Sequence, residues 1–164
     1  MINALIYGIG GKMGANVISA INDTDGIQVV CGVDKYAPET VKVPVYSSAC
    51  EVKEKVDVVI DFSRAETIDD ILAFAKKTGC ALVLATTGYS EAQQAAIDEM
   101  GKSVPVFQAS NFSLGINLLI DLAKRAAKTL GLAYDVEIVE AHHNMKVDAP
   151  SGTALMLAES ANAA

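Results

Sequence analysis

The chain has 164 residues, of which 51% are hydrophobic and 20% charged, so it can fill a folded core and does not have a disordered composition. Its formal charge is −7, and no cluster of Lys and Arg is present, which argues against nucleic acid as a partner. Although mean hydropathy is +0.31, no apolar run approaches the roughly 20 residues of a membrane-spanning helix. An anionic ligand would therefore need a local positive site.

The three cysteines, Cys31, Cys50 and Cys80, are odd in number and form no Cys-x-x-Cys motif. We interpret them as buried, reduced thiols. The N-terminus has neither the basic region nor the long apolar region of a signal peptide, and its first residues predict a strand. We therefore expect a cytoplasmic protein without a membrane partner.

Short apolar runs alternate with amphipathic stretches along the chain. The pattern predicts strands at residues 4–7, 28–33, 43–46, 56–62, 81–85, 104–108 and 136–141. Helices are predicted at residues 13–21, 63–77, 90–100 and 113–130, with a final helix from residue 151. Four of the helices have a serine at the expected N-cap, and the first two of these serines open a Ser-x-x-Glu/Gln capping box: Ser63, Ser90, Ser113 and Ser151.

This alternation of strands and helices predicts an α/β fold with a parallel sheet that is covered on both faces. In such sheets the ligand lies beyond the carboxyl ends of the strands. Each loop with informative residues follows a predicted strand, so we expect these loops to line one rim of the sheet: residues 8–14, 34–35, 62–63, 86–88 and 110–112.

The turn after the first predicted strand is rich in glycine. It fits the Gly-x-x-Gly-x-x-Gly variant of the dinucleotide-binding fingerprint, with Gly8, Gly11 and Gly14. In this motif one glycine makes the tight turn, one lets the backbone approach a pyrophosphate, and one allows close packing of helix on strand. The free N–H groups of the helix N-terminus would face the phosphates, and Lys12 would add a charge. A purely structural turn is the alternative.

Asp34 follows the second predicted strand, 20 positions after Gly14. A carboxylate in this position binds the ribose hydroxyls of NADH and repels a 2′-phosphate. Lys35 would offset that repulsion, so we expect NADH and NADPH both to bind, with a preference for NADH. The alternative is that Asp34 is a turn residue before Pro38.

Residues 140–154 are the densest chemical segment and contain the only two histidines of the chain. Lys146 follows the histidines, and a cap at Ser151 would leave the first helical N–H groups, those of Gly152 and Thr153, facing outward. Together these groups make a site for a carboxylate-sized anion. A metal site is disfavoured because neighbouring histidines on a strand point apart and no cysteine is near. The structural alternative is a capped helix with two surface histidines.

The segment at residues 140–154, EAHHNMKVDAPSGTA, resembles the signature of the dihydrodipicolinate reductase family almost residue for residue. The resemblance extends in order over essentially the whole chain, through residues 8–14, 59–63 (VIDFS), 85–89 (ATTGY) and 110–117 (SNFSLGIN). It implies NAD(P)H-dependent reduction of 4-hydroxy-tetrahydrodipicolinate to tetrahydrodipicolinate, in lysine and diaminopimelate biosynthesis. The substrate would be a cyclic dicarboxylate.

The resemblance also implies a role for each matching residue. His142 matches the proton donor and acceptor, and Lys146 matches a second proton donor near a substrate carboxylate. Substrate-binding positions are matched by His143, Gly152 and Thr153. Positions that bind NADH and/or NADPH are matched by Gly8, Ile9, Gly10, Gly11, Lys12, Met13, Asp34, Lys35, Ala85, Thr86, Thr87, Ala109, Ser110, Asn111 and Phe112. No metal ligand is implied.

Two domains follow from the same resemblance. Residues 1–112 would form a Rossmann-like, doubly wound dinucleotide-binding domain, and residues 113–164 the N-terminal part of an α+β domain for substrate binding and oligomerisation. Members of the family continue further, with strands that complete an open mixed sheet used in a homotetramer. We expect the second domain to be incomplete in this chain, so turnover and assembly by the chain alone stay open.

Two other functions remain as alternatives. The first is a different two-domain NAD(P)-dependent dehydrogenase that acts on an acyclic amino- or hydroxy-acid. The second is a nucleotide-binding chain that holds the cofactor without turnover.

Overall fold

The computed structural model of the protein describes residues 1–144, 146 and 149–164. The chain forms two compact units, Met1–Ala109 and Ser110–Ala164, which we call the N-terminal unit and the C-terminal unit. Each is described by itself below. No helix among the described residues is long and apolar enough to cross a membrane.

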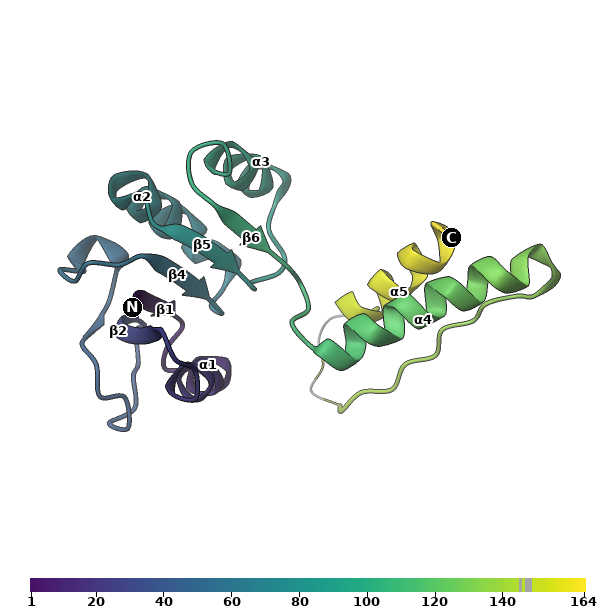
Figure 1. The fold of residues 1–164 in the computed structure, drawn as a ribbon, viewed down its shortest axis with the longest axis horizontal. Helices are drawn as coiled ribbons and strands as arrows, with labels where there is room; N and C mark the ends of the chain where they lie inside the picture. Colours follow the sequence, from purple (N-terminus) through teal and green to yellow (C-terminus); the bar gives the residue numbers. More distant parts are fainter. Residues whose placement is uncertain (145, 147–148) are drawn as a thin grey trace. The chain divides into compact units, whose positions relative to one another are not determined.

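The N-terminal unit is built on a six-stranded sheet in the order β3-β2-β1-β4-β5-β6 (Figure 1). Every neighbouring pair of strands is parallel. This is the strand order of the doubly wound dinucleotide-binding fold, so the predicted fold class is confirmed. The strands are β1 (Ile2–Tyr7), β2 (Ile27–Val33), β3 (Val45–Tyr46), β4 (Val58–Asp61), β5 (Ala81–Leu84) and β6 (Val106–Gln108).

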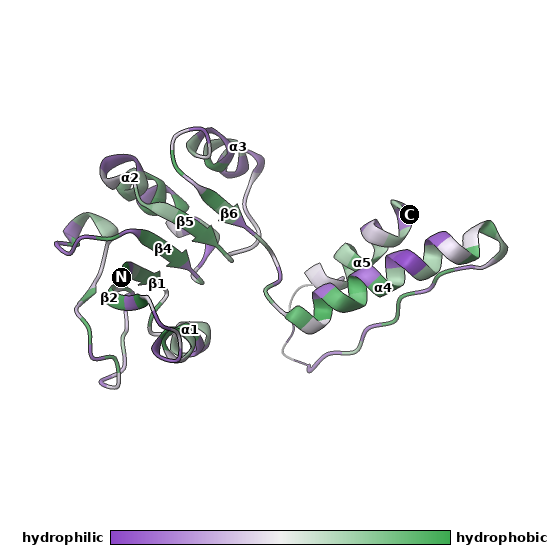
Figure 2. Ribbon diagram, viewed as in Figure 1, coloured by the Kyte–Doolittle hydropathy of each residue, from purple (hydrophilic) through white to green (hydrophobic). Residues whose placement is uncertain are grey.

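Helices cover both faces of the sheet, with α1 (Lys12–Asn22) on one face and α2 (Ile68–Thr78) and α3 (Glu91–Met100) on the other (Figure 1). The central strand β1 serves both cores because its side chains alternate between the faces. Ala4 and Ile6 join the core beneath α1, whereas Leu5 and Tyr7 join the core beneath α2. The buried strands are accordingly apolar along most of their length (Figure 2).

The two predicted capping boxes differ in outcome. At α3 the box is confirmed, because Ser90 Oγ accepts the Gln93 N–H and the Gln93 side chain accepts the Ser90 N–H. At Ser63 the prediction was wrong: a 3₁₀ helix η2 (Ala65–Thr67) comes first, and α2 begins at Ile68 without a side-chain cap. The Ser63 side chain is instead turned towards the fully buried carboxylate of Asp61, to which its hydroxyl donates.

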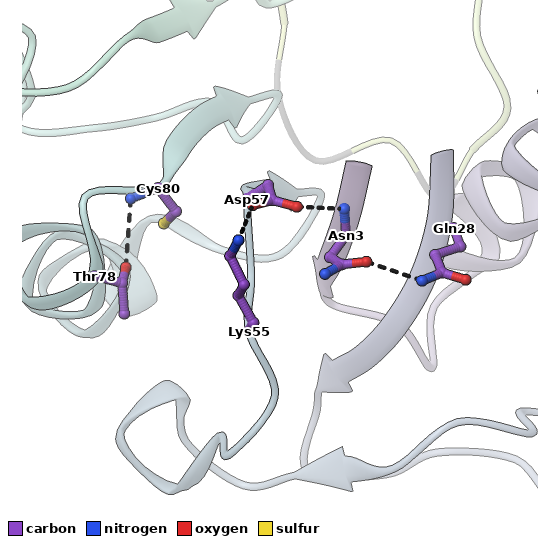
Figure 3. A network of polar contacts seen from close by, with 6 residues as sticks. All are labelled: Asn3, Gln28, Lys55, Asp57, Thr78 and Cys80. Carbon is purple, nitrogen blue, oxygen red and sulfur yellow. Dashed lines mark hydrogen bonds and ion pairs between the residues drawn. The ribbon is translucent and has the colours of Figure 1, made fainter. Parts of the chain in front are cut away.

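Polar contacts hold the register at the amino edge of the sheet (Figure 3). Asp57, just before β4, accepts the Asn3 N–H at 2.9 Å and donates its own N–H to the Asn3 carbonyl at 2.8 Å. The Asn3 side chain accepts a hydrogen bond from Gln28, and Lys55 lies 3.9 Å from the Asp57 carboxylate. These contacts link β1, β2 and β4 at the edge opposite the carboxyl ends.

The C-terminal unit contains α4 (Leu114–Leu130), the 3₁₀ helix η3 (Gly131–Ala133) and α5 (Gly152–Asn162), and α5 lies along α4 (Figure 1). The predicted caps are confirmed: Ser113 Oγ accepts the Ile116 N–H and Ser151 Oγ accepts the Ala154 N–H. Gly131 ends α4 with a φ of 60°. Neither helix has a buried residue.

The predicted strand at residues 136–141 was wrong, since these residues form no strand ladder with any described part of the chain. A strand is defined by its hydrogen bonds to a neighbour, and an apolar run alone does not supply one. Val136, Ile138 and Val139 are instead exposed. The prediction for the cysteines also needs correction: Cys31 and Cys80 are buried, but Cys50 is exposed.

Candidate functional site

The glycine turn leaves the carboxyl end of β1, at the centre of the sheet. Gly8 has a φ of +83°, and a Cβ there would lie 2.7 Å from the Phe62 carbonyl oxygen. A Cβ at Gly14 would lie 2.6 Å from the carbonyl oxygens of Gly8 and Ile9, so α1 packs on the turn after β1 through a glycine. Gly8 therefore makes the turn and Gly14 the close packing, as the motif predicts.

Gly11 has a different environment from its neighbours. It is the N-cap of α1, is exposed, and a Cβ there would meet nothing closer than the Gly8 carbonyl oxygen at 3.4 Å. No side chain caps the helix, and no acidic residue lies in its first turn. The first amides of α1 are therefore open to an anion such as a phosphate, with exposed Lys12 beside them.

Asp34 follows β2 and lies directly against this turn. Its Oδ2 accepts the Gly10 N–H at 2.8 Å, and its Oδ1 accepts the Tyr36 N–H at 3.1 Å. A Cβ at Gly10 would lie 2.0 Å from the Tyr36 carbonyl oxygen. The resemblance gave Gly10 a cofactor-binding position, and the structure adds that it is the glycine that lets the loop after β2 approach the turn.

The loops after β4 and β5 complete the carboxyl edge. Thr86 is buried, and no hydrogen bond to a described residue satisfies its hydroxyl, which lies near the Tyr89 phenol. Asp61 ends β4, is fully buried, and accepts a hydrogen bond from Tyr89 at 3.2 Å. Sequence reasoning assigned no role to Asp61 or Tyr89. The signal was an acid at the end of the apolar run Val-Val-Ile.

Residues 109–112 fall where one compact unit ends and the other begins. Ala109 ends the N-terminal unit and donates its N–H to Leu84 in β5. Ser110 bonds to the Met156 sulfur within the C-terminal unit, and Asn111 Oδ1 accepts the Ser113 N–H. The side-chain nitrogen of Asn111 is buried with no partner among the described residues.

A second cluster lies in the C-terminal unit, before α5. Glu140 Oε1 accepts the Ser151 N–H at 2.9 Å, and its Oε2 lies 3.8 Å from Nδ1 of His142. The pKa of Glu140 is lowered chiefly by its hydrogen bonds with Ser151, and further by the charges of His142 and Lys146. His142, Lys146 and the start of α5 are therefore brought together around one carboxylate, which sequence reasoning had left without a role.

The other predicted substrate residues border this cluster. His143 is exposed, and its carbonyl accepts the Lys146 N–H at 3.2 Å. Gly152 and Thr153 open α5, where the first amides have no acceptor within the helix. Residues 145, 147 and 148 of the same segment lie outside the described residues. Among those that are described, no group of three His, Cys, Asp or Glu side chains is placed to hold a metal ion.

The strand order and the glycine turn define the N-terminal unit as a Rossmann-type dinucleotide-binding fold. Comparison with known families is more specific. The family region described as "Dihydrodipicolinate reductase, N-terminus" matches residues 2–112, and the region described as "Dihydrodipicolinate reductase, C-terminus" matches residues 115–164. The chain belongs to the dihydrodipicolinate reductase family.

Curated relatives of the chain are named 4-hydroxy-tetrahydrodipicolinate reductase. A 4-hydroxy-tetrahydrodipicolinate reductase of Caldanaerobacter subterraneus is 49% identical over 162 residues, which cover 99% of this chain and 64% of the relative. One from Clostridium novyi is 44% identical over 157 residues, covering 96% of this chain and 62% of the relative. The chain thus spans less than two thirds of the length of these relatives.

Solved structures agree with this assignment. Dipicolinate-bound dihydrodipicolinate reductase from Paenisporosarcina sp. TG-14 matches with a TM-score of 0.76 and 28% identity, over 98% of this chain and 65% of that one. An NAD-binding protein from Listeria innocua matches with a TM-score of 0.63 at 20% identity, over 79% of this chain and 41% of that one, which is a likeness of fold.

Proposed function

We propose that this chain carries out NAD(P)H-dependent reduction of 4-hydroxy-tetrahydrodipicolinate to tetrahydrodipicolinate, in lysine and diaminopimelate biosynthesis. The proposal rests on two sites found together in a member of this family. One is the glycine turn with Asp34, and the other is the cluster around Glu140, His142 and Lys146. The first suits a dinucleotide, and the second offers donors to a dicarboxylate.

The residues at the carboxyl edge of the sheet fit a nicotinamide dinucleotide. The open amides of α1 and the space at Gly11 suit the pyrophosphate, and the Asp34 carboxylate has lone pairs left for ribose hydroxyls. The buried, unsatisfied hydroxyl of Thr86 is a further polar group for which a cofactor atom would serve as a partner. We propose that NADH and NADPH both bind, with NADH preferred because Asp34 repels a 2′-phosphate.

The substrate loses its hydroxyl group as water, and bound NAD(P)H supplies a hydride to the ring carbon. This chain's residues would then handle charge and protons. Lys146 and the first amides of α5, at Gly152 and Thr153, would hold a substrate carboxylate. His142 would donate the proton that the ring nitrogen needs after hydride addition, with Lys146 as the second donor and His143 as a substrate contact.

The test is a titration of the full chain with pyridine-2,6-dicarboxylate, with and without NADH, together with an assay of NADH oxidation. We expect NADH to bind, the dicarboxylate to bind more tightly in its presence, and His142→Ala or Lys146→Ala to lower turnover about 10²-fold with NADH affinity retained. Turnover in both variants that is unchanged from that of the unaltered chain would refute the assignment. Turnover of acyclic amino- or hydroxy-acids, with none of the cyclic substrate, would favour the alternative dehydrogenase.

We also propose that the chain works in the cytoplasm and as a homo-oligomer. All three cysteines are free, as suits a reducing compartment. The exposed apolar residues of the C-terminal unit would be covered in an assembly, and they include Leu114, Leu118, Leu119, Leu122, Leu132, Val136 and Val139.

A further inference from the structure

A carboxylate that pairs with no cation among the described residues is buried at the carboxyl end of β4. Asp61 is 0% exposed, and its Oδ1 accepts both the N–H of Ser63, at 2.9 Å, and the Ser63 hydroxyl. Its Oδ2 accepts the Tyr89 hydroxyl at 3.2 Å. Burial of a carboxylate is unfavourable unless hydrogen bonds satisfy its oxygens, so each of these donors matters to the fold.

Tyr89 reaches Asp61 from the loop that follows β5. Its ring packs against the core beneath α2, and burial, together with the charge of Asp61, raises the pKa of its phenol. The phenol therefore stays protonated and donates to the carboxylate. The contact joins residues 28 positions apart in the chain, so it ties the loop after β4 to the loop after β5.

Two further contacts hold the segment after β4, one within it and one to α3. Ser63 Oγ lies 2.7 Å from Thr67 Oγ1, just before α2, and the Gln93 side chain donates to the Ala65 carbonyl at 2.9 Å. The segment from Ala85 to Gly88 follows β5: the Ala85 N–H donates to the Asp61 carbonyl at 2.9 Å, and Gly88 has a φ of +82° with open space around it. Thr86, in this segment, holds the buried hydroxyl that no described residue satisfies. The segment is thus held at its ends while it faces the carboxyl edge of the sheet.

We propose that Asp61 and Tyr89 are positioning residues for the dinucleotide: their hydrogen bond clamps the loops after β4 and β5 and keeps Thr86 and its neighbours in the conformation that receives the cofactor. The inference rests on the proposed function, because it takes a nicotinamide dinucleotide as the ligand of this edge. Neither residue need touch the cofactor. A loop already held in its binding conformation loses less entropy when the ligand arrives, so the clamp raises affinity.

The test is the dissociation constant for NADH, measured by fluorescence titration on the full chain, below the unfolding temperature of every variant. Tyr89→Phe removes the donor but keeps the ring, and we expect it to weaken NADH binding about five- to tenfold. Tyr46→Phe is the matched control, because the half-buried Tyr46 also donates to a carboxylate, that of Glu54, from the edge strand β3. We expect Tyr46→Phe to change NADH affinity less than twofold.

A second pair uses the two ends of β4. Asp61→Asn keeps the shape but removes the charge and exchanges one acceptor for a donor, whereas Asp57→Asn makes the same change at the amino edge (Figure 3). Both should lower thermal stability, but only Asp61→Asn should reduce the rise in Tm that saturating NADH produces. Equal NADH affinity in Tyr89→Phe, Tyr46→Phe and the unaltered chain would overturn the clamp. Failure of the unaltered chain to bind NADH would instead refute the proposed function, and the inference with it.

Discussion

At the scale of single residues, the hydrogen bond between Gly10 and Asp34 shows how closely the glycine turn after β1 and the loop after β2 approach each other. Gly10 has no room for a side chain because the loop after β2 crosses it, and its N–H is held by the Asp34 carboxylate. Gly11, one position later, has that room. The two adjacent glycines are therefore needed for different reasons: Gly10 for the packing of the folded chain, and Gly11 for the proposed ligand.

Alanine at these two positions should separate the constraints. Gly10→Ala should lower the free energy of unfolding by about 2 kcal/mol, because its Cβ displaces the Tyr36 backbone and strains the bond to Asp34. Gly11→Ala should change the free energy of unfolding by less than about 1 kcal/mol. It should nevertheless weaken NADH binding at least tenfold, because a methyl group would fill the proposed position of the pyrophosphate. Urea unfolding and NADH titration measure the two effects. Equal stability of both variants would contradict the steric argument.

The thiols should differ in reactivity in the order of their burial. Burial, with a further contribution from Glu54, raises the pKa of Cys31 to about 12. Burial also raises the pKa of Cys80, whereas Cys50 is exposed. We expect one thiol, Cys50, to react quickly with a disulfide reagent at pH 8, and the other two to react only on unfolding. Rapid labelling of Cys31 in the native protein would show that this core opens.

The same pKa shift predicts the alkaline limit of stability. The folded thiol of Cys31 holds its proton up to about pH 12, whereas an unfolded thiol ionises near pH 8.5. The contribution of this difference to the free energy of unfolding is therefore complete below about pH 8.5 and is lost as pH rises from there towards 12. The phenols of Tyr7 and Tyr89, whose pKa values are also raised, act in the same direction. Urea midpoints should therefore fall between pH 8.5 and 11, and a flat or rising profile would count against the shift.

At the scale of elements, two similar sequence patterns had different outcomes. Ser90 and Gln93 form a complete capping box at α3. Ser63 and Glu66 have the same spacing, but the buried carboxylate of Asp61 takes the Ser63 hydroxyl, and α2 begins later. A local pattern predicts a cap only where the serine side chain is free to turn towards the helix, and the contact that holds Ser63 is visible only once β4 and its loop are placed.

Alanine substitution of the last residue of each pattern tests this difference. Gln93→Ala removes the bond to the Ser90 N–H and the bond to the Ala65 carbonyl, so it should lower the free energy of unfolding by about 1–2 kcal/mol. Glu66→Ala, at an exposed position outside any cap, should change it by less than about 0.5 kcal/mol. Thermal or urea unfolding gives both values. A larger loss at Glu66 would mean that its capping box forms after all.

At the scale of the whole molecule, the two units differ in how many of their apolar side chains are buried. The N-terminal unit has two cores, one on each face of its sheet. Its helix α2 buries Ile68, Ile71, Leu72, Phe74 and Ala75, whereas α4 and α5 bury none of their residues. Because most helical stability in proteins comes from the packing of an apolar face, the C-terminal unit should be the less stable part of the chain.

Hydrogen exchange on the full chain at low concentration measures this difference. We expect the amides of β1 and α2 to exchange only through global unfolding, and those of α4 and α5 to exchange at least about 10²-fold faster. Raising the protein concentration should slow exchange in α4 and α5 alone if an assembly covers their apolar residues. Protection of α4 equal to that of α2 at every concentration would contradict the burial pattern.

The sequence by itself determined the features that depend on neighbouring residues. The alternation of apolar runs and amphipathic stretches predicted the parallel α/β sheet, and spacing predicted the caps at Ser90, Ser113 and Ser151. The glycine turn and the acid after β2 were likewise visible in the sequence, because turn geometry and phosphate binding are local requirements. The segment of residues 140–154 indicated the family, to which the whole chain belongs.

Only the tertiary structure decided the contacts between segments far apart in the chain. It joined Gly10 to Asp34, Asp61 to Tyr89, and Glu140 to the start of α5. It also left residues 136–141 without a strand ladder to any part of the chain that the structure describes, although their apolar pattern suits one. The physical reason is the same in each case: a hydrogen bond or a strand pairing needs a partner, and the fold, not the local pattern, brings that partner within reach.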